Sequence, residues 1–150
     1  MLKLTATEST WVKENTMFAN CQMGGTNMGM PDVCKTPVGP AIVPIPYPNI
    51  SMGATANPSS AAKKVLISGG PGHTVGTEIP MSNGDQPGVA GGIISGKIMG
   101  PTKFLMGSTA TFFGGKPAAR LTSMTGQNGS SMNIPGITMA PAQTKVLILK

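Results

Sequence analysis

The chain has 150 residues, enough for one ordinary domain, and carries a formal net charge of +6 from 11 basic and 5 acidic side chains. Its 21 glycines and 14 prolines exclude a largely helical protein, because Gly and Pro cost about 1 and about 3 kcal/mol inside a helix. An apolar content of 39% with only 11% charged residues excludes a disordered chain. The composition predicts short strands joined by tight turns.

The first half of the chain is dominated by loop chemistry. Residues 1–20 lack helical periodicity and are expected to form an extended arm or a first strand. Prolines recur at two- to four-residue intervals within 31–50, which predicts a polyproline-like strap lying against a surface. The apolar side chains between the prolines, such as Ile42 and Val43, are expected to be buried by that contact, although a ligand for a proline-reading domain is the alternative. One helical turn is expected after Pro58, capped by Asn57 or Ser59.

The second half is predicted to contain short strands separated by glycine turns. These strands are 63–68, 93–99, 103–106, 109–113, 116–121 and 145–149. The segment 71–92 between them is rich in turn residues. Gly114-Gly115 forms a two-residue hairpin turn, which requires positive φ and therefore favours glycine. The sequence KVLI occurs at both 64–67 and 145–148, as if two strands occupied equivalent places.

The charge pattern argues against nucleic-acid binding. The basic residues are dispersed, with Lys63-Lys64 as the only adjacent pair, and the chain has one Trp, one Tyr and four Phe. Nucleic-acid surfaces gather Lys and Arg, often beside stacking platforms.

The N-terminus has no apolar run of signal-peptide type, and no stretch approaches the length of a membrane span. A cytoplasmic protein is therefore expected, with Cys21 and Cys34 reduced unless another route exports it.

No catalytic constellation can be assembled from the sequence. Asp85 lies in a Ser-Asn-Gly-Asp turn, and Asp32 follows Pro31, so both are interpreted as turn residues. The other carboxylates are scattered, and neither a nucleophile elbow nor a phosphate loop is present. The chain is therefore expected not to be an enzyme.

Metal binding is the one chemical option left open. The soft ligands of the chain are Cys21, Cys34 and His73, and their spacing fits no zinc finger. They are weak candidates for a zinc site. Buried thiols and a histidine bonded to loop backbone form the favoured interpretation.

Three segments carry a resemblance to a known family. The segment GSTATFFGGKPAARLTS (107–123) resembles the hairpin that names the PAAR-repeat proteins, and PDVCKTPVGPAIVPIPYPNI (31–50) and GTEIPMSNGDQPGVAGG (76–92) resemble its PAAR-like branch. Together the three segments cover most of 17–149. The motif hairpin consists of Gly114, Gly115, Lys116, Pro117, Ala118, Ala119 and Arg120.

The resemblance implies a mostly β fold, a small cone of β-hairpins with Gly/Pro-rich loops and little helix. It divides the chain into an N-terminal arm (1–16) and a PAAR-like cone (17–150). It also implies a non-enzymatic spike tip of a type VI secretion system or a related contractile injection system. Such a tip caps a trimeric VgrG-type spike, one tip per trimer, and its vertex leads through the target membrane, which it contacts transiently. It waits in the bacterial cytoplasm and is exported on the spike without a signal peptide.

Two other functions are kept as alternatives. The cone could be an adaptor that recruits a separate toxin effector or its chaperone through 1–16 or the proline strap. It could also be a small metalloenzyme using Cys21, Cys34 and His73. No toxin domain follows the cone in the sequence given, so a stand-alone tip is expected.

The resemblance has one clear departure. Many PAAR cones hold zinc near the vertex through a histidine after the motif, but Arg120 is followed here by Leu-Thr-Ser-Met-Thr-Gly-Gln-Asn, so that site cannot be transferred. Within the motif, the alanines are expected to allow close approach of a neighbouring strand. Arg120 is expected to brace carbonyls or a carboxylate.

Overall fold

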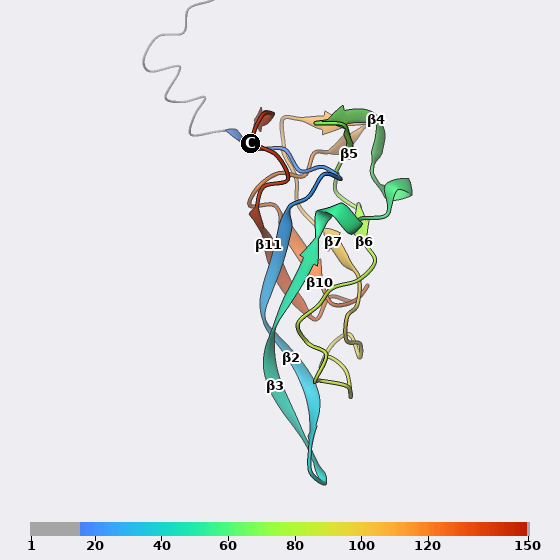
Figure 1. The fold of residues 1–150 in the computed structure, drawn as a ribbon, viewed down its shortest axis with the longest axis vertical. Helices are drawn as coiled ribbons and strands as arrows, with labels where there is room; N and C mark the ends of the chain where they lie inside the picture. Colours follow the sequence, from blue (N-terminus) through green and yellow to red (C-terminus); the bar gives the residue numbers. More distant parts are fainter. Residues whose placement is uncertain (1–15, 150) are drawn as a thin grey trace, which may run out of the picture.

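The computed structural model describes residues 16–149 and shows an elongated, tapering molecule whose regular secondary structure is almost entirely strands (Figure 1). This confirms the predicted mostly β class. Among the described residues the helical elements are two short 3-10 turns, η1 (Gly53–Thr55) and η2 (Pro58–Ser60). In this part of the chain no helix has the length and apolar character needed to cross a membrane. The predicted N-terminal arm lies outside the described residues except for Thr16.

The body of the molecule is a six-stranded antiparallel sheet in the order β3-β2-β11-β10-β7-β6. Its strands are β3 (Ala41–Met52), β2 (Thr26–Val38), β11 (Ile134–Ala140), β10 (Met124–Gln127), β7 (Thr102–Phe104) and β6 (Glu78–Ile79). β2 and β3 are much longer than the others and continue as a two-stranded hairpin to the pointed end (Figure 1). Gly39, at φ 60°, makes the turn at the point.

Three two-stranded ribbons make up the opposite, broad end, which we call the ribbon end (Figure 1). They are β1 (Thr16–Phe18) with β12 (Leu147–Leu149), β4 (Ala62–Ile67) with β5 (Gly70–Gly72), and β8 (Phe112–Phe113) with β9 (Lys116–Pro117). The ribbons share one small apolar core. Ile67, Phe113 and Ile148, one from each ribbon, pack there with Ala19, Cys21 and Ala118.

Four strands of the six-stranded sheet, β3, β2, β11 and β10, bury mainly polar side chains, whereas β7 and β6 bury Phe104 and Ile79. Along β11, Thr138 is buried, whereas its neighbours Ile137 and Met139 are 45% and 58% exposed. The same inversion occurs on the neighbouring strands, because alternate residues of a strand point to opposite faces. Buried polar residues of the sheet include Asn27, Asn49, Ser51, Thr125 and Gln127. The outer face carries Met28, Met30, Met52 and Met124.

Several predicted elements are confirmed in place. The predicted strand 63–68 is β4, and 145–149 contains β12. The strands predicted around the motif are present but shorter. Asn57 caps η2 as expected, since its side chain accepts a hydrogen bond from the Ser59 N–H at 3.1 Å.

Two predictions are wrong. The segment 93–99 forms turns, because its backbone follows bends around Asn133 instead of pairing with a strand. The proline strap at 31–50 is the β2–β3 hairpin, and Ile42 and Val43 are 63% and 40% exposed. A β-strand tolerates these prolines because they occupy alternate positions, 44, 46 and 48, on an edge strand.

Candidate functional site

The motif hairpin has the predicted two-residue turn. Gly114 and Gly115 have φ of 60° and 84°, both in the left-handed region that glycine adopts without strain. The turn places Phe113 opposite Lys116 and Phe112 opposite Pro117. As a result Phe113 enters the apolar core, whereas Phe112 stays 55% exposed.

Ala118 and Ala119 lie where several backbone segments meet. The Ala119 N–H donates to the His73 carbonyl, and the Ala119 carbonyl accepts from the Asn20 N–H, both at 2.9 Å. On the other side, the Ala118 carbonyl accepts from the Ser108 N–H at 2.7 Å. Both alanine side chains are fully buried between these backbone segments, which lie outside the strands.

Arg120 is fixed through its backbone. Its N–H donates to Ser123 Oγ at 2.9 Å, and its carbonyl accepts from Asn20 Nδ2 at 3.1 Å. The Nε of its side chain is buried and has no hydrogen-bond partner among the described residues. Within this part of the chain, the expected bracing of a carboxylate is therefore not seen.

The two KVLI strands are equivalent, as the sequence hinted, and the motif hairpin supplies a third member. In each ribbon one residue enters the shared core: Ile67, Phe113 and Ile148. The residue before it lies on the opposite face of the strand and is exposed. These three outward residues are Leu66 (65% exposed), Phe112 (55%) and Leu147 (54%). The ribbon end thus presents one large apolar side chain from each ribbon.

The three soft ligands predicted as weak zinc candidates occupy separate environments. Cys21 is packed in the apolar core. His73 is fully buried, and its Nε2 lies 3.3 Å from Gln22 Oε1. Burial lowers the pKa of His73 to about 4, so its imidazole is neutral near neutral pH. Cys34 lies in β2 beside two aspartates instead, so the structure does not assemble the three residues into one site.

Asp32, Cys34 and Asp85 form the cluster of potential metal ligands that the structure does contain within 16–149. Their ligand atoms lie within 4.8 Å of one another, and all three residues are fully buried. The interpretation as a turn residue is therefore wrong for Asp32, which lies in β2. Asp85 does begin a turn, since its carbonyl accepts from the Gly88 N–H at 2.9 Å, but its carboxyl group belongs to this buried cluster. Asp32 accepts from Asn128 and Asn133, about a hundred positions away, and Asp85 accepts from the Met99 N–H at 3.0 Å.

The amide groups around this cluster fix its chemistry. Asn128 Oδ1 accepts from the Gly100 N–H at 2.9 Å, and its Nδ2 donates to the Lys97 carbonyl at 2.8 Å, to Asp32 and to the Cys34 sulfur. The Asn133 amide is held in the same way, because Oδ1 accepts from Ile94 N and Nδ2 donates to the Val33 carbonyl. Amide N–H donors therefore already bond to Asp32 and contact the Cys34 sulfur, two of the three potential ligands.

Burial and the neighbouring carboxyl groups raise the pKa values of Asp85 and Cys34 in this cluster. Desolvation, assisted by a hydrogen bond to Asp32, raises the pKa of Asp85 from 3.8 to about 6. Burial beside the two aspartates raises the pKa of the Cys34 thiol to about 12. Hence Cys34 is not a thiolate at neutral pH, which argues against a role as a nucleophile.

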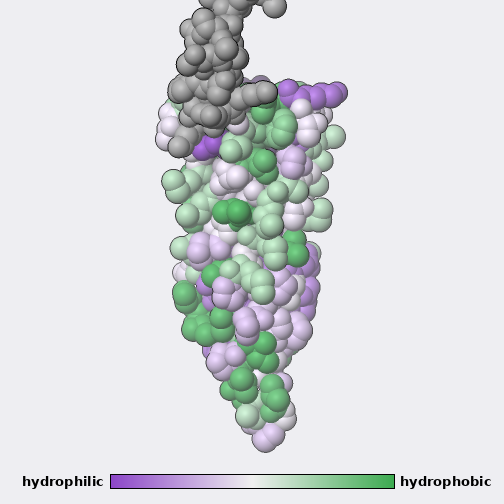
Figure 2. All heavy atoms as spheres, turned by 90° about the vertical axis from the view of Figure 1, so that its left-hand side faces the viewer, coloured by the Kyte–Doolittle hydropathy of each residue, from purple (hydrophilic) through white to green (hydrophobic). Residues whose placement is uncertain are grey.

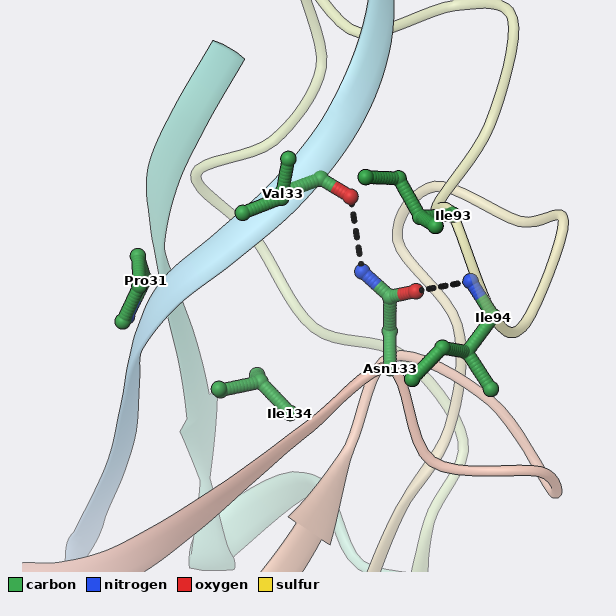
Figure 3. Close-up of a pocket in the computed structure, with 6 residues that line it drawn as sticks. All are labelled: Pro31, Val33, Ile93, Ile94, Asn133 and Ile134. Atoms are coloured by element: carbon green, nitrogen blue, oxygen red, sulfur yellow. Dashed lines mark hydrogen bonds between the residues drawn. The ribbon is translucent and has the colours of Figure 1, made fainter. Parts of the chain in front are cut away.

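A shallow apolar groove lies next to this cluster, on the flank of the pointed half (Figure 3). It has a volume of about 290 Å³ and is lined by Pro31, Val33, Ile93, Ile94, Asn133 and Ile134. Figure 3 shows the Asn133 side chain joining the Val33 backbone to the Ile94 backbone across the groove. Sequence analysis missed this groove, because its residues come from three distant segments.

Comparison with protein families identifies the chain. Residues 25–136 match the model of the toxin PAAR-like domain. The chain belongs to this family. Membership in the toxin PAAR-like family confirms the resemblance found in the sequence and supports a spike-associated or effector-linked role. No curated protein and no solved structure matches the chain.

Proposed function

We propose that the protein is a non-enzymatic tip for a trimeric VgrG-type spike of a type VI secretion system or a related contractile injection system. One protein caps one trimer, with the ribbon end docked on the spike and the pointed end leading. Before the system fires, the protein is located in the bacterial cytoplasm, and on firing it is exported at the tip of the spike.

The threefold repetition at the ribbon end carries this proposal. Three ribbons each place one residue in a shared core and one exposed apolar residue on the outside. A trimer offers three identical chains around its axis, so a monomer that docks on its end needs three similar contacts. Leu66, Phe112 and Leu147 can supply one apolar contact to each spike chain.

The two-stranded ribbons also suit a β-helical partner. A two-stranded sheet leaves strand edges whose N–H and C=O groups can accept an additional strand. Such backbone pairing would add directional hydrogen bonds around the three apolar contacts. The tapering shape of the sheet then extends away from the spike (Figure 1).

Native mass spectrometry with the purified spike trimer of the same system tests the proposal. We expect one protein bound per trimer. Leu66→Asp should weaken binding at least tenfold, because a charge would replace a central apolar contact. Ile42→Asp is the matched control, since Ile42 is 63% exposed, against 65% for Leu66, and lies at the opposite end.

Two results would overturn the proposal. One is a wild-type protein that forms no complex with the trimer. The other is equal weakening by Leu66→Asp and Ile42→Asp, because contacts confined to the ribbon end cannot be disturbed from the point.

A further inference from the structure

We propose that the pointed end inserts spontaneously into a lipid bilayer with anionic headgroups, without the force of an injection machine. The inserting part is the turn of the β2–β3 hairpin, residues 37–44, which we call the hairpin end. This inference names what the leading pointed end of the proposed spike tip would meet, a membrane, and it rests on the proposed function for its biological setting. It does not depend on docking to a spike.

The hairpin end is apolar and fully displayed. All eight residues, Pro-Val-Gly-Pro-Ala-Ile-Val-Pro, are exposed, and none carries a polar side chain. Val38, Ile42 and Val43 are 52%, 63% and 40% exposed. Figure 2 shows hydrophobic side chains gathered close to the narrow end. Exposed apolar clusters of this kind are costly in water and mark surfaces that meet a partner or a membrane.

The prolines reduce the number of unpaired backbone N–H groups that the hairpin would carry into the hydrocarbon core of a bilayer. The Lys35 N–H points away from β3 and donates to the Gly91 carbonyl at 2.8 Å. Lys35 and Pro44 therefore form a non-hydrogen-bonded pair of the β2–β3 ladder, in which the backbone groups of both residues point away from the partner strand. The Pro44 nitrogen thus lies on the outer edge of β3. By the same alternation Pro46 and Pro48 have outward nitrogens, none of which bears a hydrogen. The outer edge of β3 is thereby nearly free of the unpaired donors that a bilayer disfavours.

The charges near the hairpin end suit an anionic surface. Lys35 and Lys97 are exposed, and the Lys97 carbonyl accepts from Gly92 in the loop that pairs with β2. Asp32 and Asp85 are fully buried. The remaining carboxylate of the described residues, Glu78, pairs with Lys103 at 3.1 Å. The pointed half therefore displays cations without exposed anions, which favours acidic lipid headgroups.

The position of Lys35 sets a depth of insertion. Four residues lead from Lys35 to Gly39, and a strand advances about 3.3 Å per residue, so the lysine lies about 13 Å behind the turn. One leaflet contributes about 15 Å to a hydrocarbon core of about 30 Å. With the hairpin end in one leaflet, Lys35 reaches the headgroups.

The apolar groove on the flank continues this surface behind the lysine. Val33 lines the groove two residues from Lys35, and its carbonyl accepts from the Ile93 N–H at 3.1 Å. Ile93 and Ile94 are 56% and 68% exposed. These side chains would meet the boundary between headgroups and acyl chains, where partly apolar surface is favoured.

Flotation with lipid vesicles tests the inference. Purified wild-type protein is mixed with vesicles of phosphatidylcholine, or of phosphatidylcholine and phosphatidylglycerol in equal parts, at low ionic strength. We expect flotation with the anionic vesicles and much weaker flotation with the zwitterionic ones. Ile42→Asp should lower the partition coefficient at least tenfold, because it places a carboxylate in the hydrocarbon region. Leu66→Asp, an equally exposed change at the ribbon end, should leave it within about twofold.

A pair of charge variants separates headgroup binding from general adhesion. Lys35→Gln with Lys97→Gln should lower binding to anionic vesicles about thirtyfold, since each lysine near an anionic surface strengthens binding roughly fivefold. Lys63→Gln with Lys64→Gln removes the same charge from two exposed positions of β4, at the ribbon end, and should have little effect.

Several outcomes would overturn the inference. They are a wild-type protein that does not float, equal losses for Ile42→Asp and Leu66→Asp, and equal losses for the two lysine pairs. The inference would also be overturned if the wild-type protein were a dimer in solution and Ile42→Asp made it a monomer, because a second copy would then cover the hairpin end. Vesicle binding without any spike complex would contradict the proposed function and leave this inference standing.

Discussion

The ribbon end buries apolar side chains, whereas strands β3, β2, β11 and β10 of the six-stranded sheet bury mainly polar ones. At the ribbon end, Ile67, Phe113 and Ile148 form a small core. In the sheet, Asn133 and Asp32 belong to a network of buried hydrogen bonds, and methionines cover the outside. The difference shows that a polar interior can replace an apolar core where its buried donors and acceptors are paired, as they are around Asn133.

Loss of Phe113 should sharpen the comparison most. Phe113→Ala removes the largest side chain of the ribbon core and should lower the free energy of unfolding by about 3–5 kcal/mol. Chemical denaturation measures this change. Phe112→Ala is the control on the neighbouring residue, and it should stay within about 0.5 kcal/mol because Phe112 is 55% exposed. Similar losses for both variants would contradict the assigned faces of β8.

The polar interior should respond almost as strongly to the loss of one amide. Asn133→Ala leaves the Ile94 and Ser95 N–H groups without their acceptor and removes one of the two amide donors to Asp32, and should cost about 2–3 kcal/mol in denaturation. Asn133→Asp should be no better, since it adds a carboxylate beside Asp32. Asn83→Ala, at an exposed asparagine, provides the control, and a loss as large as that of Asn133→Ala would show that the network is not special.

The Asp85 carboxyl should make the stability of the sheet depend on pH. Its pKa is raised from 3.8 to about 6, so the stabilisation is complete below the pKa of the unfolded chain and is lost as the pH rises through 6. Between pH 4 and pH 7 this loss should be of the order of 2 kcal/mol. Asp85→Asn imitates the protonated acid, so its denaturation midpoint should lack this pH dependence. A variant that follows the wild-type profile would show that another group titrates.

The smallest effect is expected on the outer face of the sheet. Ile137→Thr should change the free energy of unfolding by less than about 0.5 kcal/mol, because the Ile137 side chain is 45% exposed to solvent. Thr138→Val, one residue along β11, should cost about 2 kcal/mol, since Thr138 Oγ1 donates to Asn27 and accepts from Asn20. The opposite ranking, measured by thermal or chemical unfolding, would restore the ordinary burial rule.

The features that sequence could predict are local ones. Glycine pairs at positive φ, such as Gly114-Gly115, follow from backbone sterics alone, and so does the Asn57 cap. The repeated KVLI pointed to two equivalent strands, because the same four residues favour the same burial. The family resemblance drew on the same local segments.

The features that sequence could not predict depend on distant partners. Asp32 and Asp85 read as turn residues because the amides that bury them lie far along the chain. The β2–β3 hairpin could not be predicted because prolines normally argue against a strand. Their alternate positions are compatible with a strand only because β2 pairs with the opposite edge of β3. The inverted sheet also defeats an assignment of the core from hydrophobicity, since methionine lies outside and asparagine inside.

The pairing of β1 with β12 has a consequence for the order of folding. Thr16 lies opposite Leu149, so the first and last described strands close the same ribbon. During synthesis Ile148 leaves the ribosome long after Ile67 and Phe113, and the shared core stays incomplete until it arrives. Contacts between residues so far apart in sequence also slow the search for the native state. The ribbon end should therefore be the last region to acquire protection from hydrogen exchange.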